Sequence, residues 1–136
     1  MIIGAYGDLD LRGTGLQKNH LNQNAAFNTR IDRSEGIAIA MKGNAVTDID
    51  TPHYNFHESL ESFWNKYRKG GEFSGTTPTS GQYGAAVEKA LVAAGYKAPA
   101  ARAIQQFASD QRATARIGVN EPVPNIPKPM GQKKRP

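Results

Sequence analysis

The clearest pattern of apolar and polar positions lies between residues 51 and 68. Apolar side chains recur there at the spacing of one helical stripe, and they are Phe56, Leu60, Phe63, Trp64 and Tyr67. Thr51 can accept a hydrogen bond from a free backbone N–H group as N-cap, and Pro52 has the backbone angle of a first helical residue. The pattern therefore predicts a helix over 51–68 whose apolar stripe faces inward.

Shorter patterns precede this helix. We expect a short strand that leads into His20, followed by a helical turn. Residues 36–42 alternate large apolar and small side chains, which is typical of a β-strand with one buried face. Gly43 and Asn44 then favour a turn, and residues 45–47 a second short strand. The predicted order is strand, loop, hairpin, helix.

Two further helices are predicted, over 80–94 and about 99–116. Ser80 is placed to cap the first of them, and Gly95 is placed to end it. The second has a predicted buried face made of Ala100, Ile104, Phe107 and Ala108. Its arginines are expected on the exposed side, and they are Arg102, Arg112 and Arg116.

The two ends of the chain differ in composition from its middle. Residues 1–15 hold four glycines and show no apolar period, which predicts a leader or linker. Residues 119–136 hold five prolines and end in basic residues, which predicts a flexible basic tail. One compact domain is therefore expected over 16–118, with neither a membrane span nor a signal peptide in the chain.

Charge and cysteine content narrow the chemistry. The formal net charge is +5 and the isoelectric point is near 9.6, which favours polyanions, although proteins that bind no nucleic acid also have such a balance. There is no cysteine, so disulfides and thiolate ligands are excluded. Lys66, Arg68 and Lys69 form a basic cluster at a helix end, where they either complement the helix dipole or position phosphates.

The candidate chemistry rests on histidines. His53 and His57 are one helical turn apart, a spacing that brings two imidazoles to one divalent cation. Packing, or capping of the helix, is the alternative interpretation of this pair. His20 can take a proton from water, and Asn44 can orient that imidazole. Such a set suits a nuclease with one metal ion, because the ion and the base act on opposite sides of the phosphorus.

Three short segments also carry a resemblance to a known family. Residues 17–23 (QKNHLNQ), 43–44 (GN) and 51–57 (TPHYNFH) resemble the C-terminal nuclease domains of bacterial polymorphic toxins, including Rhs proteins and others exported by type VI or related secretion. These domains belong to the HNH, or His-Me finger, superfamily, and the resemblance is to the groups with a double-histidine motif. It implies an α+β, mostly helical fold, with a ββα-metal core over about 16–70 and a helical extension over about 80–118.

The resemblance also assigns roles to individual residues. His20 corresponds to the general base, Asn44 to the residue that orients it, His57 to a metal ligand, and His53 to a second ligand or phosphate contact. The metal is one divalent ion, with Mg, Mn, Zn and Ni not distinguished. The expected substrate contacts are Lys18, Lys66, Arg68 and Lys69.

Asn19 departs from the family pattern, because a histidine that binds metal usually occupies this position. An amide oxygen suits a hard cation such as magnesium but is a weaker ligand than imidazole for zinc-like metals. Two interpretations stay open: Asn19 is a natural variant tuned to magnesium, or it is an inactivating substitution.

Together these features predict a metal-dependent endonuclease that acts on DNA. The resemblance implies that it is the toxic module of a larger secreted polypeptide, is delivered into the cytoplasm of a target bacterium, and is neutralised in its producer by an immunity protein. An RNase of the same fold is one alternative. A noncatalytic basic module that binds nucleic acid or protein is another, and it predicts no metal-dependent loss of plasmid.

Overall fold

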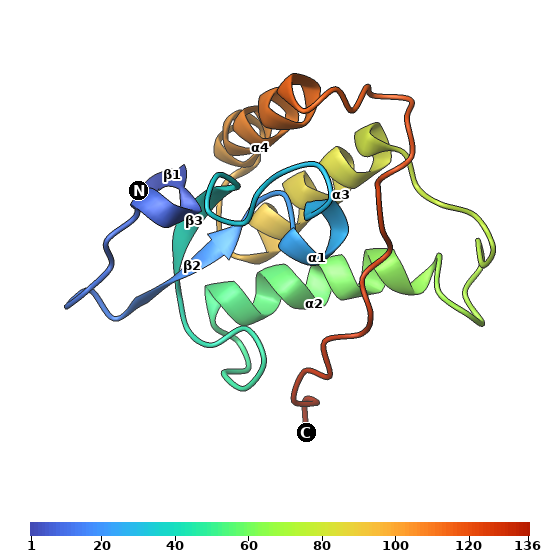
Figure 1. The fold of residues 1–136 in the computed structure, drawn as a ribbon. Coiled ribbons are helices and arrows are strands. Elements are labelled where there is room, and N and C mark those ends of the chain that lie inside the picture. Colours follow the sequence, from blue (N-terminus) through green and yellow to red (C-terminus); the bar gives the residue numbers. More distant parts are fainter.

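The computed structural model describes all residues from 1 to 136. It is an α+β structure with four α-helices and one small antiparallel sheet, which agrees with the predicted fold class at this level (Figure 1). In chain order its elements are strand β1 (Ile3–Ala5), the 3-10 helix η1 (Tyr6–Asp8), β2 (Leu16–His20), α1 (Asn24–Phe27), β3 (Ile37–Lys42), α2 (Pro52–Asn65), α3 (Ser80–Ala93) and α4 (Ala98–Thr114). None of these helices combines the length and the apolar character that a membrane span requires.

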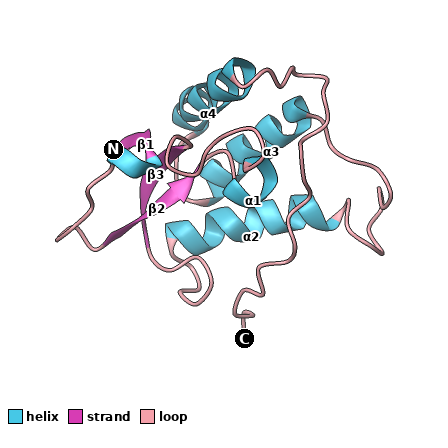
Figure 2. Cartoon of the chain, viewed as in Figure 1, coloured by secondary structure: helices cyan, strands magenta, loops and turns pink.

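The sheet has three strands in the order β1-β3-β2, so β3 lies in the middle and β2 at an edge (Figure 2). Both pairings are antiparallel, and Ile39 of β3 lies opposite Ile3 on one side and Asn19 on the other. The N-terminal segment, predicted as a leader, thus supplies a strand. Its next residues are also fixed, because the backbone N–H groups of Tyr6 and Gly7 donate to the carbonyls of Gly36 and Ser34.

The helices form a layer in which α3 packs between α2 and α4, while α2 and α4 also contact β3. Their facing stripes build one core with the inner face of the sheet. The largest fully buried side chains of this core include Leu21, Phe27, Ile39, Phe56, Leu60, Trp64, Tyr83, Leu91 and Ile104. The core thus joins the sheet to the three long helices that follow it.

The ends of the helices follow local signals. The Oγ1 atom of Thr51 accepts a hydrogen bond from the Tyr54 N–H at the start of α2, and Pro52 is its first residue, as predicted. At α3 the cap is Thr79 and not the predicted Ser80. The Thr79 hydroxyl and the Gln82 side chain bond each other's backbone N–H groups in a capping box.

The predicted strand over 45–47 is absent. The Asn44 side-chain oxygen accepts hydrogen bonds from the N–H groups of Val46 and Thr47, which folds these residues into a turn. Gly43, just before the turn, has a φ of +97°, and a Cβ atom there would overlap Thr51. A side chain with an amide oxygen and a glycine therefore make this connection from β3 to α2.

The predicted buried face of α4 is right for Ile104 and Ala108 and wrong for Ala100 and Phe107. Ala100 and Phe107 are exposed, whereas the inward stripe consists of Ala101, Ile104, Ala108 and Arg112. Arg112 was expected outside and is only 2% exposed. It is accommodated because its guanidinium donates hydrogen bonds to Ser80, Asn22 and Gln105 side chains.

The C-terminal segment, predicted as a flexible tail, lies against the helices (Figure 1). Val123 is buried and its N–H donates to the Pro78 carbonyl, while Gln132 donates to the carbonyl of Tyr54 in α2. Near the end, Arg135 forms ion pairs with Asp50 (2.7 Å) and Glu58 (2.9 Å). The segment crosses α2 and contributes to the fold despite its prolines.

Candidate metal centre

The candidate centre lies where β2 meets α2. Successive side chains of a strand point to opposite faces, so Asn19 points inward toward α2 while its neighbours point out. His53 and His57 point toward the same region from the first two turns of α2, and their ring centroids are 5.1 Å apart. The Asn19 Oδ1 atom is 2.9 Å from Nε2 of His57. The structure thus brings together three of the predicted site residues.

All three side chains are nearly shielded from solvent, with 2%, 6% and 8% of Asn19, His53 and His57 exposed. Because a carbonyl-type oxygen only accepts, the imidazole of His57 donates through Nε2 to Asn19, and that of His53 donates through Nδ1 to the Gly43 carbonyl at 3.1 Å. Nδ1 of His57 then keeps its lone pair and has no hydrogen-bond partner. A buried polar atom without a partner is uncommon in folded proteins, so His57 is a candidate for a functional role.

Burial also fixes the charge of the two imidazoles. Desolvation, reinforced by the nearby His53, lowers the pKa of His57 to about 3. Desolvation likewise lowers the pKa of His53, against the opposing effect of its hydrogen bond to Gly43. Both rings are therefore neutral at pH 7, and a neutral imidazole is the form that binds a metal ion.

The donor set suits a divalent ion by its chemistry, since the two neutral imidazoles each keep one lone pair and Asn19 has an amide oxygen. Nε2 of His57 carries the proton that is donated to Asn19, so a bond from Nε2 to the ion would replace this hydrogen bond. No group of three His, Cys, Asp or Glu residues lies in one place anywhere in the chain. Two imidazoles and one amide oxygen are thus the donors here, and other positions would be left to water or substrate.

His20 does not join this group, so the prediction of one set that unites it with His53 and His57 is wrong in its geometry. It follows Asn19 in β2, so its ring lies on the other face of the sheet, stacked on Tyr6 with centroids 4.2 Å apart and planes within 2°. His20 is the last residue of an edge strand. The two predicted halves of the site consequently flank the end of β2 on opposite sides.

The residue that orients His20 is Arg33 and not Asn44. Nε2 of His20 donates to the Arg33 carbonyl at 2.9 Å, which leaves the lone pair on Nδ1. A Cβ atom on Gly36 would come within 2.7 Å of the His20 ring, so the glycine leaves room for it. Burial, with Arg33 and Lys18 nearby, lowers the pKa of His20. The Asn44 side chain is used within its own turn, as described above.

A buried polar network that the sequence did not reveal holds the three residues after His20. The Tyr83 hydroxyl donates to the Leu21 carbonyl (2.7 Å) and accepts from the Gln23 N–H (2.9 Å). The Gln23 side chain accepts from the Trp64 indole, and the Asn22 side chain accepts from Arg112. Three helices thus fix the end of β2. The dense amides of this segment were the only signal in the sequence.

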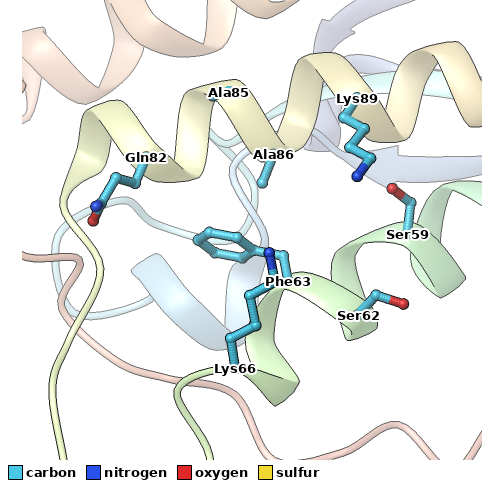
Figure 3. Close-up of a pocket in the computed structure, with 8 residues that line it drawn as sticks. All are labelled: Ser59, Ser62, Phe63, Lys66, Gln82, Ala85, Ala86 and Lys89. Atoms are coloured by element: carbon cyan, nitrogen blue, oxygen red, sulfur yellow. The ribbon is translucent and has the colours of Figure 1, made fainter. Parts of the chain in front are cut away.

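The basic cluster at the end of α2 is only partly available to a substrate. Arg68 pairs with both oxygens of Glu61, at 2.7 and 3.2 Å, and donates to the Pro127 carbonyl, so it anchors the C-terminal segment. Lys69 is exposed. Lys66 lines a hollow of about 350 Å³ between α2 and α3, in which it and Lys89 extend from opposite helices around Phe63 (Figure 3). Lys18, the fourth predicted contact, shares the sheet face of His20.

Comparisons of the chain with family models, with curated proteins and with solved structures return no match. The site must therefore be judged on its geometry.

Proposed function

We propose that this chain is a metal-dependent endonuclease that acts on DNA, with β2, β3 and α2 as a ββα-metal core. The observation that carries the proposal is the buried contact between Asn19 and His57, with His53 beside it, at the junction of an antiparallel strand pair and the following helix. Neutral imidazoles and an amide oxygen at one junction are suited to a divalent ion.

In this proposal Asn19, His53 and His57 hold the ion. When bound, the ion would neutralise the charge that develops on the leaving oxygen of a phosphodiester. His20 is the proton acceptor for the attacking water, because it is neutral at pH 7 and its unprotonated Nδ1 is set by the bond from Nε2 to Arg33. In this proposal a substrate strand would pass the end of β2, where Asn19 and His20 are consecutive residues.

The proposed biological setting rests on the resemblance of residues 17–23, 43–44 and 51–57 to toxin nuclease domains. The domain is the toxic module of a secreted polypeptide that enters a target bacterium, and a cognate immunity protein restrains it in the producer. RNA is the alternative substrate of the same chemistry.

One observation favours a second candidate, a noncatalytic basic module. His20 and the helix histidines lie on opposite faces of β2, and Asn19 occupies its position with a completed hydrogen bond to His57. A chain that lost its activity through this residue would keep the fold and the positive charge and bind nucleic acid without cutting it.

A plasmid assay tests the proposal. Supercoiled plasmid and a structured RNA are incubated with the chain in Mg²⁺, Mn²⁺, Zn²⁺ or Ni²⁺, each with and without excess chelator. We expect nicking that needs a metal and is lost in His57→Gln, while Lys97→Gln, an exposed control, cuts like the parent. Absence of cleavage with every metal, or cleavage that chelator does not stop, would reject the endonuclease and favour the binding module or another chemistry.

A further inference from the structure

A hollow of about 410 Å³ opens on the sheet face that carries His20. Six residues line it: Tyr6, Gly7, Lys18, Asp32, Arg33 and Ser34. We call it the Tyr6 hollow. Its walls are held in place, because η1 is hydrogen-bonded to the loop before β3 through Gly7 and Ser34. His20 contacts two of the lining residues, Tyr6 through its ring and Arg33 through the carbonyl.

Two cations converge in the Tyr6 hollow. The Lys18 ammonium lies 4.7 Å from the centroid of the Tyr6 ring, and the Arg33 guanidinium carbon lies 4.9 Å from it. Lys18 comes from β2, two residues before His20 and on the same face, whereas Arg33 comes from the loop before β3. Segments distant in the sequence therefore bring two positive charges to one place.

Neither cation forms an ion pair with a carboxylate, and the nearby Asp10 is paired with Arg12. The ion pairs of the structure involve other residues, and Asp32, the one acidic residue of the lining, pairs with neither Lys18 nor Arg33. Lys18 donates one hydrogen bond to the Tyr6 carbonyl, and Arg33 donates one to the Tyr6 hydroxyl. An ammonium has three N–H donors and a guanidinium five, so both keep donors for a ligand. Unpaired cations with free donors are what a phosphate group requires.

We propose that the Tyr6 hollow binds a phosphate group of a nucleic-acid strand, held by Lys18 and Arg33 next to His20. The identity of this ligand rests on the proposed function, whereas the anion site rests on the geometry alone. It assigns substrate binding to Arg33, which no sequence motif indicated, and directs the strand past the end of β2. The basic cluster near Arg68 then has no necessary part in binding at this end.

Binding without turnover tests the proposal. A fluorescein-labelled duplex of moderate length is titrated with the full chain in excess chelator, and anisotropy is followed from low to physiological salt. The variants are Lys18→Gln, Arg33→Gln and Arg33→Lys, with Lys97→Gln and Lys128→Gln, both exposed, as controls of equal charge change. Arg33 is exposed, and its backbone bond to His20 survives every substitution, so its variants are expected to fold.

We expect Lys18→Gln and Arg33→Gln each to weaken duplex binding about fivefold to tenfold and to reduce the salt dependence by about one phosphate contact. Arg33→Lys, which keeps the charge, should bind the duplex almost as tightly as the parent. The controls should change affinity by less than about twofold. Equal losses of affinity in the site and control variants would mean that only general electrostatic attraction holds the duplex. No loss of affinity in the site variants would mean that the Tyr6 hollow does not bind it. Both results overturn the proposal.

A competition arm separates a strand from free phosphate. Inorganic phosphate is added at constant ionic strength, and we expect it to leave most of the duplex bound. If low millimolar phosphate displaces the duplex completely from the parent but not from Arg33→Gln, the hollow is a site for free phosphate. This result would overturn the assignment to a nucleic-acid strand. Chelator is present throughout, so the binding result does not depend on whether the chain cleaves DNA. If the parent cleaves DNA and the site variants bind the duplex normally, the phosphate site in the Tyr6 hollow is rejected and the endonuclease proposal is not.

Discussion

Asn19 on β2 and His57 on α2 are joined by a buried hydrogen bond of 2.9 Å between Oδ1 and Nε2. This bond connects the edge of the sheet to the second turn of the helix, and it places an amide oxygen beside two neutral imidazoles. The remaining polar atom of His57, Nδ1, has no partner. Whether the junction of β2 and α2 binds a metal ion therefore depends on Asn19 and His57 as ligands.

Replacing Asn19 by histidine is expected to increase metal affinity and cleavage. A third imidazole would join two that are already neutral at pH 7, and imidazole is the stronger ligand for zinc-like ions. A change in one catalytic element commonly alters the rate by on the order of a hundredfold. Plasmid nicking over a metal titration measures the rate, and the metal-dependent rise in melting temperature measures the affinity. Equal rates and equal shifts for parent and variant would show that position 19 is not a ligand.

His20→Ala should abolish cleavage in either background. Loss of a general base typically lowers the rate by about a hundredfold or more, and no second histidine lies on this face of the sheet. Metal binding, measured by the same thermal shift, should persist because His20 is not part of the Asn19, His53 and His57 group. Continued cutting by the variant would place the base elsewhere.

Elements with local signals could be predicted from the sequence. The start of α2 depends on Thr51 and Pro52 and on a stripe within fourteen residues, all adjacent in the chain. The strand β1 could not be found in this way, because three residues become a strand only through pairing with β3, more than thirty positions later. The stripe of α4 was misassigned because Arg112, a charged residue, is buried through partners on other elements.

The site was only half predictable for a related reason. The spacing of His53 and His57 places both on one helix face, whichever way the chain folds. Which of Asn19 and His20 meets that face depends on the register of β2, and moving one position along a strand exchanges its two faces. Nothing in the local sequence sets this choice. It is set by the packing of β2 against α2 and by the bonds that hold Leu21 and Gln23.

Arg112→Ala is expected to destabilise the chain by about 3 kcal/mol, because it leaves two buried acceptors and one half-buried acceptor without a donor. The matched control on the same helix is Arg102→Ala, whose side chain is 77% exposed and lies 3.5 Å from Glu88. That change should alter the free energy of unfolding by no more than about 0.5 kcal/mol. Urea denaturation at pH 7 compares the two. Similar small losses for both would mean that the Arg112 network contributes little.

Tyr83→Phe should be less stable than the parent at neutral pH, and this difference in stability should shrink at high pH. At pH 8 the variant lacks the hydroxyl that donates to Leu21 and accepts from Gln23, so we expect a cost of about 1–3 kcal/mol. Burial raises the pKa of Tyr83 from 10 to about 12, since the charged phenolate is disfavoured in the core.

The sign of the pH dependence follows from this shift. Between pH 10 and 12 the unfolded chain releases the Tyr83 proton while the folded chain retains it, so the contribution is complete below pH 10 and declines as the pH rises. The parent should lose on the order of 2 kcal/mol through this residue by pH 12. Phenylalanine does not titrate, and the two proteins share every other ionisable group, so the difference between their urea midpoints should narrow steadily across this window. A difference that stays constant from pH 8 to 12 would mean that the Tyr83 hydroxyl ionises equally easily in both states, and that the bonds to Leu21 and Gln23 do not hold it neutral.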